Sequence, residues 1–400
     1  MSVIGIIVLL LLAFAFSSAK RSINWRTVGG AFAIQAAIGA FILYFEPGKQ
    51  LLLKISEGVA SVIGFSQEGI NFVFGAVGNT SLGFIFAFNV LPVIIFFSSL
   101  IAVLYHLKIM NWIIQIIGGA LQKTLGTSKP ESMSAAANIF VGQTEAPLVV
   151  KPFIPHMTRS ELFAIMVGGL ASIAGSVMAG YAGLGVELKY LLAASFMAAP
   201  GGLLMAKIML PETETPKNNL DQIDDKNTYA NVFDAAASGA SNGLQLALNV
   251  GAMLLAFVAL IAMLNGGIGW IGGLLGYEGL TFQAILGFIL QPLAWAIGVP
   301  WEEAQLAGSF IGQKFAVNEF VAYIDFLENK DQLSESSQAI ITFALCGFAN
   351  LSSIAILMGG IGAMAPTRRK EIAQLGLKAV LAATLSNLMS ASLAGLFLSF

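Results

Sequence analysis

Three clusters of polar side chains interrupt a largely apolar sequence and carry the groups best suited to bind a ligand. The first is the stretch VGQTEAPLVVKP, in which Gln143, Thr144 and Glu145 stand side by side shortly before Pro147. The amide and the hydroxyl both donate and accept hydrogen bonds, whereas an ionised carboxylate only accepts them. Polar contacts between membrane helices contribute only about 0.6 kcal/mol each, and they usually take a single such residue. Three polar residues together beside a proline favour a binding site over helix packing.

The second and third clusters lie in the C-terminal half of the chain. Glu319 falls in the stretch VNEFVAY, whereas Asn350 and Ser353 fall in CGFANLSSIA. Their spacing of three residues places Asn350 and Ser353 on one helical face. A charged group at the centre of a membrane helix costs about 2.5–3.5 kcal/mol, so such groups are usually functional. Because the charged residues Asp325 and Glu328 follow Glu319 closely, a position of Glu319 near the membrane surface stays open. For Ser353, the alternative to ligand binding is the packing of small residues between helices.

Neutral oxygen ligands for a monovalent cation are also present. Where a helix unwinds inside a transporter, backbone carbonyls and side-chain oxygens coordinate Na⁺. Asn138, four residues before Gly142, and Ser172 have the chemistry for such a site. Packing between helices explains each of them equally well when it is taken alone.

Catalytic and nucleotide-binding patterns do not occur in the sequence. It contains no HExxH, paired-aspartate, GxSxG or P-loop motif, so we expect neither an enzyme nor an ATP-driven pump. The single cysteine, Cys346, excludes a disulfide framework and a cysteine-built metal site. His106 and His156 stand near lysines and are expected at the membrane surface. No basic stripe with interleaved aromatic residues supports nucleic-acid binding.

The composition defines the class of protein that positions these clusters. Of the 400 residues, 57% are hydrophobic and 10% are charged, whereas soluble domains contain about 25% charged residues. Apolar runs of about twenty residues recur along the chain, and this length matches helices that cross a hydrocarbon core of about 30 Å. We therefore predict an all-α polytopic protein of the lipid bilayer.

Eight membrane-spanning segments are expected, with both termini outside the cytoplasm. The segments are 3–19, 27–45, 82–105, 160–182, 188–209, 244–264, 338–362 and 372–399. Lysines and arginines follow the first, third and fifth of them and precede the last, and such residues mark the cytoplasmic side. The sequence SSA after the first apolar run resembles a signal-peptidase site. Because the basic residues follow that run instead of preceding it, we expect a retained span.

Two further segments, 130–155 and 300–328, are apolar but interrupted by polar groups. If either were counted as a span, the loops rich in lysine and arginine would no longer all lie on the cytoplasmic side. We therefore predict that each segment is a re-entrant hairpin. Gly142 and Pro147 suit the tip of the first hairpin, because both residues interrupt a helix.

The remaining segments complete the expected domain organisation. Segments 46–78, 108–127 and 281–299 are mixed or amphipathic, and we expect them to be interfacial or broken helices. The hydrophilic stretch 211–236 is the expected cytoplasmic linker. The chain then divides into N-terminal scaffold spans (1–105), a first unit (106–210) and a second unit (237–400).

Short matches between the two units indicate an internal repeat. FVGQ at 140–143 resembles FIGQ at 310–313, ASIA at 171–174 resembles SSIA at 352–355, and LKYLLAAS from Leu188 resembles LKAVLAAT from Leu377. Each match is weak, but the three occur in the same order. The charge argument gives the units opposite orientations, so we predict the inverted repeats that many secondary transporters contain.

The stretches GQTEAPLVVKPF, VNEFVAY and CGFANLSSIA resemble, in this order, the concentrative nucleoside transporter family, and its bacterial sodium-coupled members most closely. The resemblance covers essentially the whole chain. It implies a homotrimer in the bacterial inner membrane, in which a domain with both hairpins slides against a fixed scaffold, the elevator mechanism. It also implies symport of a nucleoside such as uridine with Na⁺.

The same resemblance implies roles for individual residues. The family's nucleobase-binding positions match Gln143, Thr144 and Glu145, and its ribose-binding set matches Glu319, Asn350 and Ser353. Its apolar pocket positions match Val177, Leu246 and Phe348. Its sodium site matches Asn138, Ser172 and the carbonyl groups of Val141 and Ile173. Some proton-coupled members differ at the position of Asn138, so this asparagine favours Na⁺.

Other functions stay open on the residues alone. One is a proton-coupled nucleoside symporter, and another is an elevator symporter for a different polar metabolite. An anionic substrate would call for arginines or helix N-termini, whereas the clusters contain Glu145 and Glu319. A third is an intramembrane enzyme that uses these two carboxyl groups as acid and base, and a fourth is a receptor or channel without coupled transport.

Overall fold

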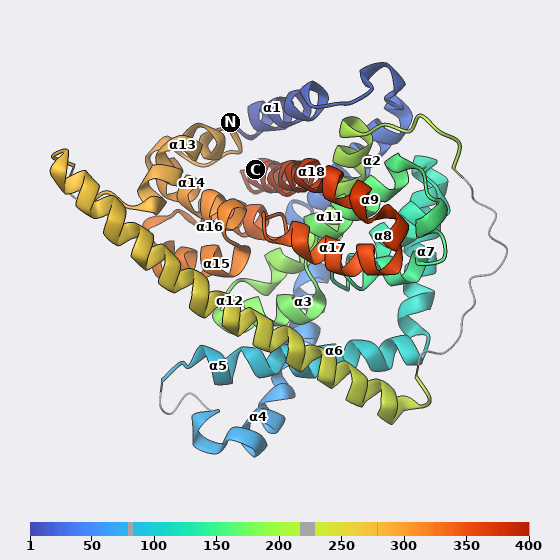
Figure 1. Ribbon diagram of the computed structural model, residues 1–400, viewed down its shortest axis with the longest axis horizontal. Coiled ribbons are helices and arrows are strands. Elements are labelled where there is room, and N and C mark those ends of the chain that lie inside the picture. Colours follow the sequence, from blue (N-terminus) through green and yellow to red (C-terminus); the bar gives the residue numbers. More distant parts are fainter. Residues whose placement is uncertain (79–82, 217–228, 278, 400) are drawn as a thin grey trace.

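The computed structural model describes residues 1–78, 83–216, 229–277 and 279–399, and within these ranges all regular secondary structure is helical (Figure 1). The α-helices are α1 (Ser2–Ala15), α2 (Trp25–Leu43), α3 (Glu46–Gly64), α4 (Ser66–Phe74), α5 (Phe86–Asn89), α6 (Leu91–His106), α7 (Ile109–Leu125), α8 (Lys129–Ala137), α9 (Arg159–Ala171), α10 (Gly175–Leu184), α11 (Leu188–Met209), α12 (Val232–Leu274), α13 (Phe282–Ala296), α14 (Trp301–Ala316), α15 (Glu319–Asn329), α16 (Glu335–Leu345), α17 (Ser353–Met364) and α18 (Arg369–Leu398). The prediction of an all-α protein is confirmed.

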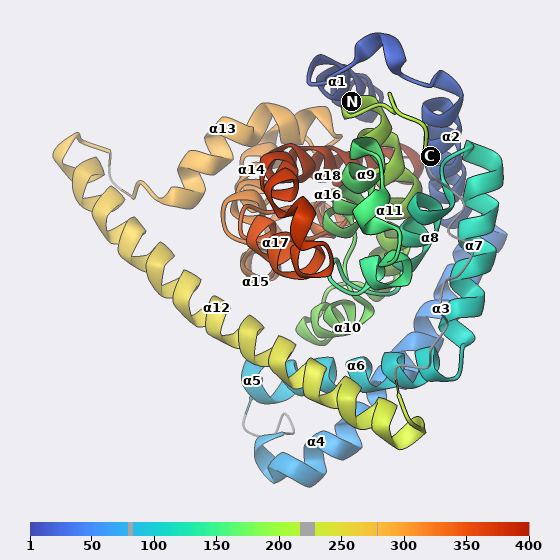
Figure 2. The ribbon, with the colours of Figure 1, turned by 45° about the vertical axis from the view of Figure 1, so that its right-hand side comes forward.

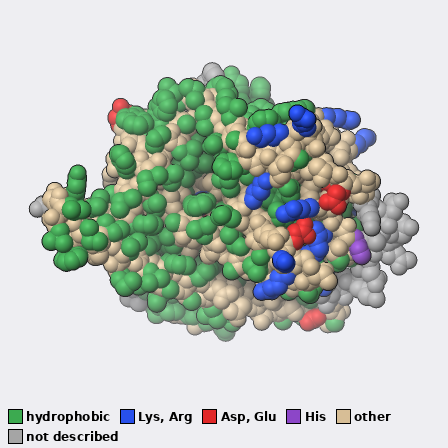
Figure 3. All heavy atoms as spheres, turned by 45° about the horizontal axis from the view of Figure 1, so that its top comes forward, with side chains coloured by type: hydrophobic (Ala, Val, Ile, Leu, Met, Phe, Trp, Pro, Cys, Tyr) green, Lys and Arg blue, Asp and Glu red, His purple; other side chains and the backbone are tan. Residues whose placement is uncertain are grey.

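Six helical segments of the described ranges are long and apolar enough to cross a membrane. They are Trp25–Leu43, Phe86–His106, Arg159–Leu184, Leu188–Met209, Val232–Leu274 and Pro366–Leu398. The first and seventh expected spans contain the shorter apolar helices α1 and α17. On the face in Figure 3, charged side chains gather over one part, and much of the rest is hydrophobic. So large an exposed apolar surface suits lipid and is unusual for a soluble monomer.

Two expected spans are broken near their centres. Residues 172–174 separate α9 from α10, and residues 346–352 separate α16 from α17. The segments 160–182 and 338–362 are therefore interrupted helices. The expectation that Asn350 and Ser353 share one helical face is wrong, because Asn350 lies in the break and α17 begins at Ser353. Backbone groups leave the helical ladder at each break. Inside a membrane protein such backbone persists only where it is buried in protein or lines a cavity.

The linker is shorter than expected at its C-terminal end. α12 begins at Val232 and continues for 43 residues, so residues 232–236 are helical and not part of a linker. Asn231 caps the first turn of α12 by accepting a hydrogen bond from the amide of Asp234 at 3.0 Å. The middle of the expected linker, residues 217–228, lies outside the described residues.

α12 and α6 form a separate pair at the edge of the molecule (Figures 1 and 2). Their backbones approach closely: a Cβ atom at Gly239 would lie 2.6 Å from the Cβ of Ala102, and one at Gly243 would lie 2.8 Å from the Cα of Ile95. Small residues allow this kind of packing between membrane helices. α11 is buried almost throughout, whereas α12 is mostly exposed. The pair α6–α12 therefore lies against a compact bundle around α11 and α18.

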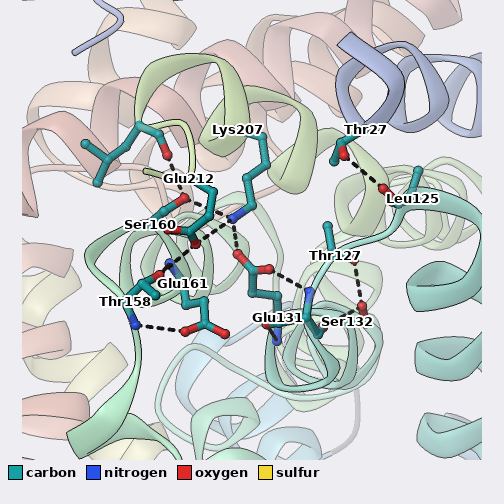
Figure 4. Close-up of polar contacts among 12 residues, drawn as sticks. Thr27, Leu125, Thr127, Glu131, Ser132, Thr158, Ser160, Glu161, Lys207 and Glu212 are labelled. Atoms are coloured by element: carbon teal, nitrogen blue, oxygen red, sulfur yellow. Dashed lines mark hydrogen bonds and ion pairs between the residues drawn. The ribbon is translucent and has the colours of Figure 1, made fainter. Parts of the chain in front are cut away.

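A buried ion pair ties the start of α8 to two long helices (Figure 4). Lys207 on α11 pairs with Glu131 on α8 and donates a hydrogen bond to the Ser160 hydroxyl on α9 at 2.9 Å. Glu131 also forms a capping box with Ser128. Separating a buried ion pair costs about 3–5 kcal/mol. This network therefore favours movement of α8, α9 and α11 as one unit.

The order of elements repeats, but the sequence matches that indicated the repeat are out of register. A hairpin segment, a broken span and a long helix follow one another as α8, α9–α10 and α11, and again as α14–α15, α16–α17 and α18. FVGQ follows α8, whereas FIGQ lies within α14. ASIA covers the break between α9 and α10, whereas SSIA lies at the start of α17. The matches therefore do not pair equivalent positions.

Candidate functional site

Both hairpin tips, both helix breaks and α12 line one cavity. The empty space inside it measures about 700 Å³, a figure that includes space open to solvent. The lining contains all nine residues expected to contact a substrate: Gln143, Thr144, Glu145, Val177, Leu246, Glu319, Phe348, Asn350 and Ser353. The fold therefore brings together residues that the sequence separates widely.

Glu319 is the buried carboxylate of this cavity. It lies in the first turn of α15 and is 4% exposed. Its Oε1 accepts a hydrogen bond from the Tyr181 hydroxyl at 3.0 Å, and its Oε2 accepts one from Asn350 Nδ2 at 2.9 Å. The helix N-terminus also favours its negative charge. Each carboxylate oxygen has more than one acceptor site, so ligand hydroxyls can donate to Glu319 as well.

The side chain of Asn350 is held in one orientation. Its Oδ1 accepts hydrogen bonds from the backbone amide of Ser353 at 2.9 Å and from the Ser352 hydroxyl at 2.7 Å. Its Nδ2 is thereby directed at Glu319. The Ser353 hydroxyl accepts a hydrogen bond from Gln143 Nε2 at 3.4 Å. This last contact connects the break in α16–α17 with the tip of the first hairpin.

The tip of the first hairpin packs closely against α9. A Cβ atom at Gly169 would lie 2.9 Å from the Cβ of Gln143. Glu145 Oε2 accepts a long hydrogen bond of 3.4 Å from the amide of Gly142 and so closes the turn. Gln143 is 4% exposed, and its Oε1 is buried without a hydrogen-bond partner. A buried acceptor of this kind is normally satisfied, and a donor group on a ligand would satisfy it.

The apolar wall of the cavity is larger than the sequence indicated. Besides Leu246, α12 contributes Val250, Met253 and Leu254 to the lining. Their spacing places them on one face of the helix. We did not expect these three residues, because the expected span 244–264 is apolar apart from Gln245 and Asn249, and its sequence does not distinguish an apolar residue that lines a cavity from one that faces lipid. Ala174, Phe320, Ser352 and Ile356 also line the cavity and were not expected there.

The residues expected to hold a cation lie together behind the first hairpin tip. Asn138 is 1% exposed, and neither atom of its amide group has a hydrogen-bond partner. A Cβ atom at Gly168 would lie 3.0 Å from Asn138 Nδ2, and the Ser172 hydroxyl donates to the Gly168 carbonyl at 3.0 Å. Val141 and Ile173 are buried in the adjoining non-helical stretches. An unpartnered buried amide suits coordination of a small cation.

The chemistry of this set favours a monovalent ion. Its candidate ligands are neutral amide, hydroxyl and carbonyl oxygens. Among the described residues, no group of three or more histidines, cysteines, aspartates or glutamates is arranged to hold a metal ion. Transition metals prefer such nitrogen, sulfur and carboxylate ligands.

A cavity that combines polar side chains with an apolar wall and is enclosed by hairpin tips and broken spans is the arrangement of a membrane transporter for a polar solute. Three family models match the chain in agreement with this class. They are described as Na+ dependent nucleoside transporter N-terminus (residues 4–77), nucleoside recognition (residues 87–187) and Na+ dependent nucleoside transporter C-terminus (residues 190–395). The chain belongs to the concentrative nucleoside transporter family, a family of multi-pass membrane transporters and not of enzymes.

Individual relatives agree with this assignment. The nucleoside permease NupC of Helicobacter pylori is 55% identical over 99% of this chain and 97% of its own length. The sodium/nucleoside cotransporter 1 of Rattus norvegicus is 38% identical over 98% of this chain and 63% of its own length. The solved structure of CNTnw in an inward-facing substrate-bound state is 57% identical, covers 100% of this chain and 97% of its own, and has a TM-score of 0.96.

Proposed function

We propose that the protein is a Na⁺-coupled symporter that imports nucleosides such as uridine across the bacterial inner membrane. The observation that carries this proposal is the distribution of polar groups in the cavity. Glu319 and Asn350 form one polar pole, Gln143 and Thr144 form another, and Val177, Leu246 and Phe348 supply apolar lining. A nucleoside has a matching distribution, with ribose hydroxyls, a flat base and a polar base edge.

Sodium coupling is supported by the position of Asn138. This residue and Gln143 belong to the same hairpin tip, and the tip packs against the broken span that carries Ser172. A cation between the two segments would fix the position of Gln143 in the cavity. Binding of the cation and binding of the nucleoside would then favour each other, because a coupling free energy between two sites is reciprocal. The names of the matching family models and of the rat relative point to the same ion.

An elevator mechanism is supported by the way two parts of the molecule share the cavity lining: the hairpins with the broken spans, and the α6–α12 pair. The polar residues of the cavity come from the hairpins and broken spans, whereas α12 supplies apolar side chains. Among the described residues, none of the hydrogen bonds made by the cavity's polar side chains ends on α12, so sliding the polar part past α12 leaves those bonds intact. In this proposal the chain has eight spans with both termini outside, and three copies assemble into a homotrimer around fixed scaffold helices.

Uptake of labelled uridine into proteoliposomes tests the function and its coupling ion. We expect accumulation against the uridine gradient when Na⁺ is present outside, and loss of accumulation when choline replaces Na⁺. The physical reason is that choline is too large for a site of buried oxygens between two packed segments. Accumulation that is unchanged in choline and follows an imposed pH gradient would contradict sodium coupling and favour a proton. Equilibration without accumulation would indicate a channel.

A further inference from the structure

A buried lysine, Lys314, lies close to the cavity without lining it. Lys314, in the last turn of α14, is 3% exposed. Its Nζ donates hydrogen bonds to the carbonyl oxygen of Ala344 at 2.8 Å and to Asn387 Oδ1 at 2.7 Å. Glu319 interacts with it electrostatically but does not form a direct ion pair with it within the described residues. The lysine is therefore held by neutral oxygens.

Asn387 on α18 connects this lysine with both broken spans. Its Nδ2 donates to the carbonyl oxygen of Ala171 at 2.6 Å and to that of Cys346 at 2.9 Å. Ala171 is the last residue of α9, and Cys346 follows the last residue of α16. One asparagine thus joins the C-terminal ends of the two half-helices, and its remaining oxygen accepts from Lys314. The C-terminus of a helix carries partial negative charge and favours a cation.

Backbone contacts give the structural register of the two units. The carbonyl oxygen of Phe140 accepts from the amide of Gly175 at 2.9 Å, and that of Phe315 accepts from the amide of Leu351 at 3.2 Å. In each unit a residue near the C-terminal end of the first hairpin helix is thereby bonded to the broken span. Phe140 lies three residues beyond α8 and bonds to the first residue of α10, whereas Phe315 lies in the last turn of α14 and bonds to Leu351 within the break before α17. Phe140 corresponds to Phe315 in this register, and Lys314 stands next to the counterpart of Asn138.

The C-terminal ends of α9 and α16, which are equivalent in the two units, differ in the charge of the side chains beside them. At the end of α9 the structure places an unpartnered amide, Asn138, and a hydroxyl, Ser172. At the end of α16 it places the Lys314 ammonium group, which hydrogen bonds to the last turn of that helix. The first place has neutral oxygens ready for a cation, whereas the second already contains a positive charge.

We propose that Lys314 is a tethered cation that takes the place of a free ion in the second unit. Its ammonium group stabilises the end of α16 and fixes hairpin helix α14 against α18, so only the first unit takes up an ion when the cavity assembles. Lys314 is a positioning residue, because it acts on the cavity through Asn387 and the break before Asn350. This inference rests on the proposed sodium coupling.

The charge moved per nucleoside tests the inference on the unaltered protein. Reversal potentials, measured in proteoliposomes with defined Na⁺ and uridine gradients, give this ratio. We expect about one elementary charge per uridine, since each charge that crosses adds a fixed term in the membrane potential. A ratio of two or more would overturn the inference and leave sodium coupling intact. Uptake that does not depend on Na⁺ at all would instead contradict the proposed function.

Substitution of the lysine tests whether its charge is needed. Lys314→Gln keeps a hydrogen-bond donor, one bond closer to the backbone, and removes the charge. We expect the Na⁺ concentration for half-maximal uridine uptake to rise by about tenfold, the scale of a typical coupling between sites, and its Na⁺ dependence to become steeper as a second ion is recruited. Lys314→Arg keeps the charge and should keep the wild-type steepness. An unchanged Na⁺ dependence in Lys314→Gln would overturn the inference.

A matched control separates loss of a charge near the cavity from loss of a buried lysine. Lys207 is also a buried lysine, 7% exposed, but it pairs with Glu131 away from the cavity. We expect Lys207→Gln to lower the temperature of unfolding while the steepness of the Na⁺ dependence stays at the wild-type value. A steeper dependence in this variant as well would show a general effect of destabilisation and would count against the role of Lys314.

Discussion

Glu319 concentrates the polar chemistry of the cavity in one side chain. Tyr181 and Asn350 each donate to one of its oxygens, and these contacts fix the carboxylate before a ligand arrives. A ligand that donates to such a preorganised group does not have to immobilise it, and this lowers the entropic cost of binding.

Replacing Glu319 or Asn350 is therefore expected to impair nucleoside binding without unfolding the protein. Glu319→Gln places an amide donor where the cavity needs an acceptor, and Asn350→Ala removes a donor to the carboxylate. A buried polar group left without a partner costs about 1–3 kcal/mol, so uridine affinity should fall roughly 5- to 150-fold. Isothermal titration calorimetry on the purified protein measures this change.

A carboxylate on the preceding hairpin helix, α14, provides the control. Glu303 accepts hydrogen bonds from the exposed Ser334 and does not line the cavity. Glu303→Gln should keep the wild-type uridine affinity, and size-exclusion chromatography should show the same assembly for all three variants. Wild-type affinity in Glu319→Gln and Asn350→Ala would contradict the proposed ribose-binding role.

Among the residues that line the cavity, the polar ones were easier to predict from the sequence than the apolar ones. Gln143, Glu319 and Asn350 stand out because polar groups are costly inside a membrane and are retained where they act. Val250 gives no such signal, since an apolar residue that lines a cavity looks like one that faces lipid. Tyr181 was missed for a related reason: its ring is buried among aromatic side chains, and only its hydroxyl reaches Glu319.

Among the elements, the first hairpin depends on close packing against two broken spans. Its tip contacts α9 at Gly169 and α17 at Gly360, where a Cβ atom would lie 2.9 Å from Thr144 Cγ2. The interruptions of helix after Ala137 and after Ala316 were predictable, because polar groups interrupt the apolar runs there. The breaks were not, because residues 172–174 and 346–352 lie in sequences apolar enough to pass for continuous spans. Tertiary contacts such as the hydrogen bond from the amide of Phe348 to the carbonyl of Ser172, 3.2 Å, stabilise them.

The neighbouring glycines of α17 allow this packing to be tested. Gly360→Ala should push Thr144 out of place, because overpacking a tight contact costs about 1–3 kcal/mol. We expect uridine affinity to fall roughly tenfold, measured by the same titration. A Cβ atom at Gly359 would meet no heavy atom of another described element within 4 Å, so Gly359→Ala on the same helix should keep the wild-type affinity. Equal affinities in the two variants would show that contact with α17 does not set the position of the tip.

For the whole molecule, the cavity lies between two bodies of different character. The α6–α12 pair is held together by glycine contacts and by the hydrogen bond from the Ser99 hydroxyl to the Ala236 carbonyl, 2.9 Å. The bundle opposite is held by buried polar networks around Lys207 and Lys314 (Figure 4 shows the first). Each body is therefore internally stiff, while the cavity wall between them is apolar on the α12 side. Hydropathy alone could not predict this division.

Linking the two bodies is expected to stop transport. Gly180 on α10 faces α6, and a Cβ atom there would lie 3.5 Å from Ile94 Cγ1, which is close enough for a disulfide between substituted cysteines. In a Cys346→Ser background, oxidation of the pair Gly180→Cys and Ile94→Cys should abolish uridine uptake, because the bundle can no longer slide along α6. A reducing agent should restore it. The control links α6 to α12 within one body, where a Cβ atom at Gly251 would lie 3.1 Å from Leu91 Cδ1. Oxidation of Gly251→Cys with Leu91→Cys, checked for closure by the loss of free thiols, should leave uptake unchanged. Full uptake with the α6–α10 link closed would mean that the cavity opens to each side without relative movement of the two bodies.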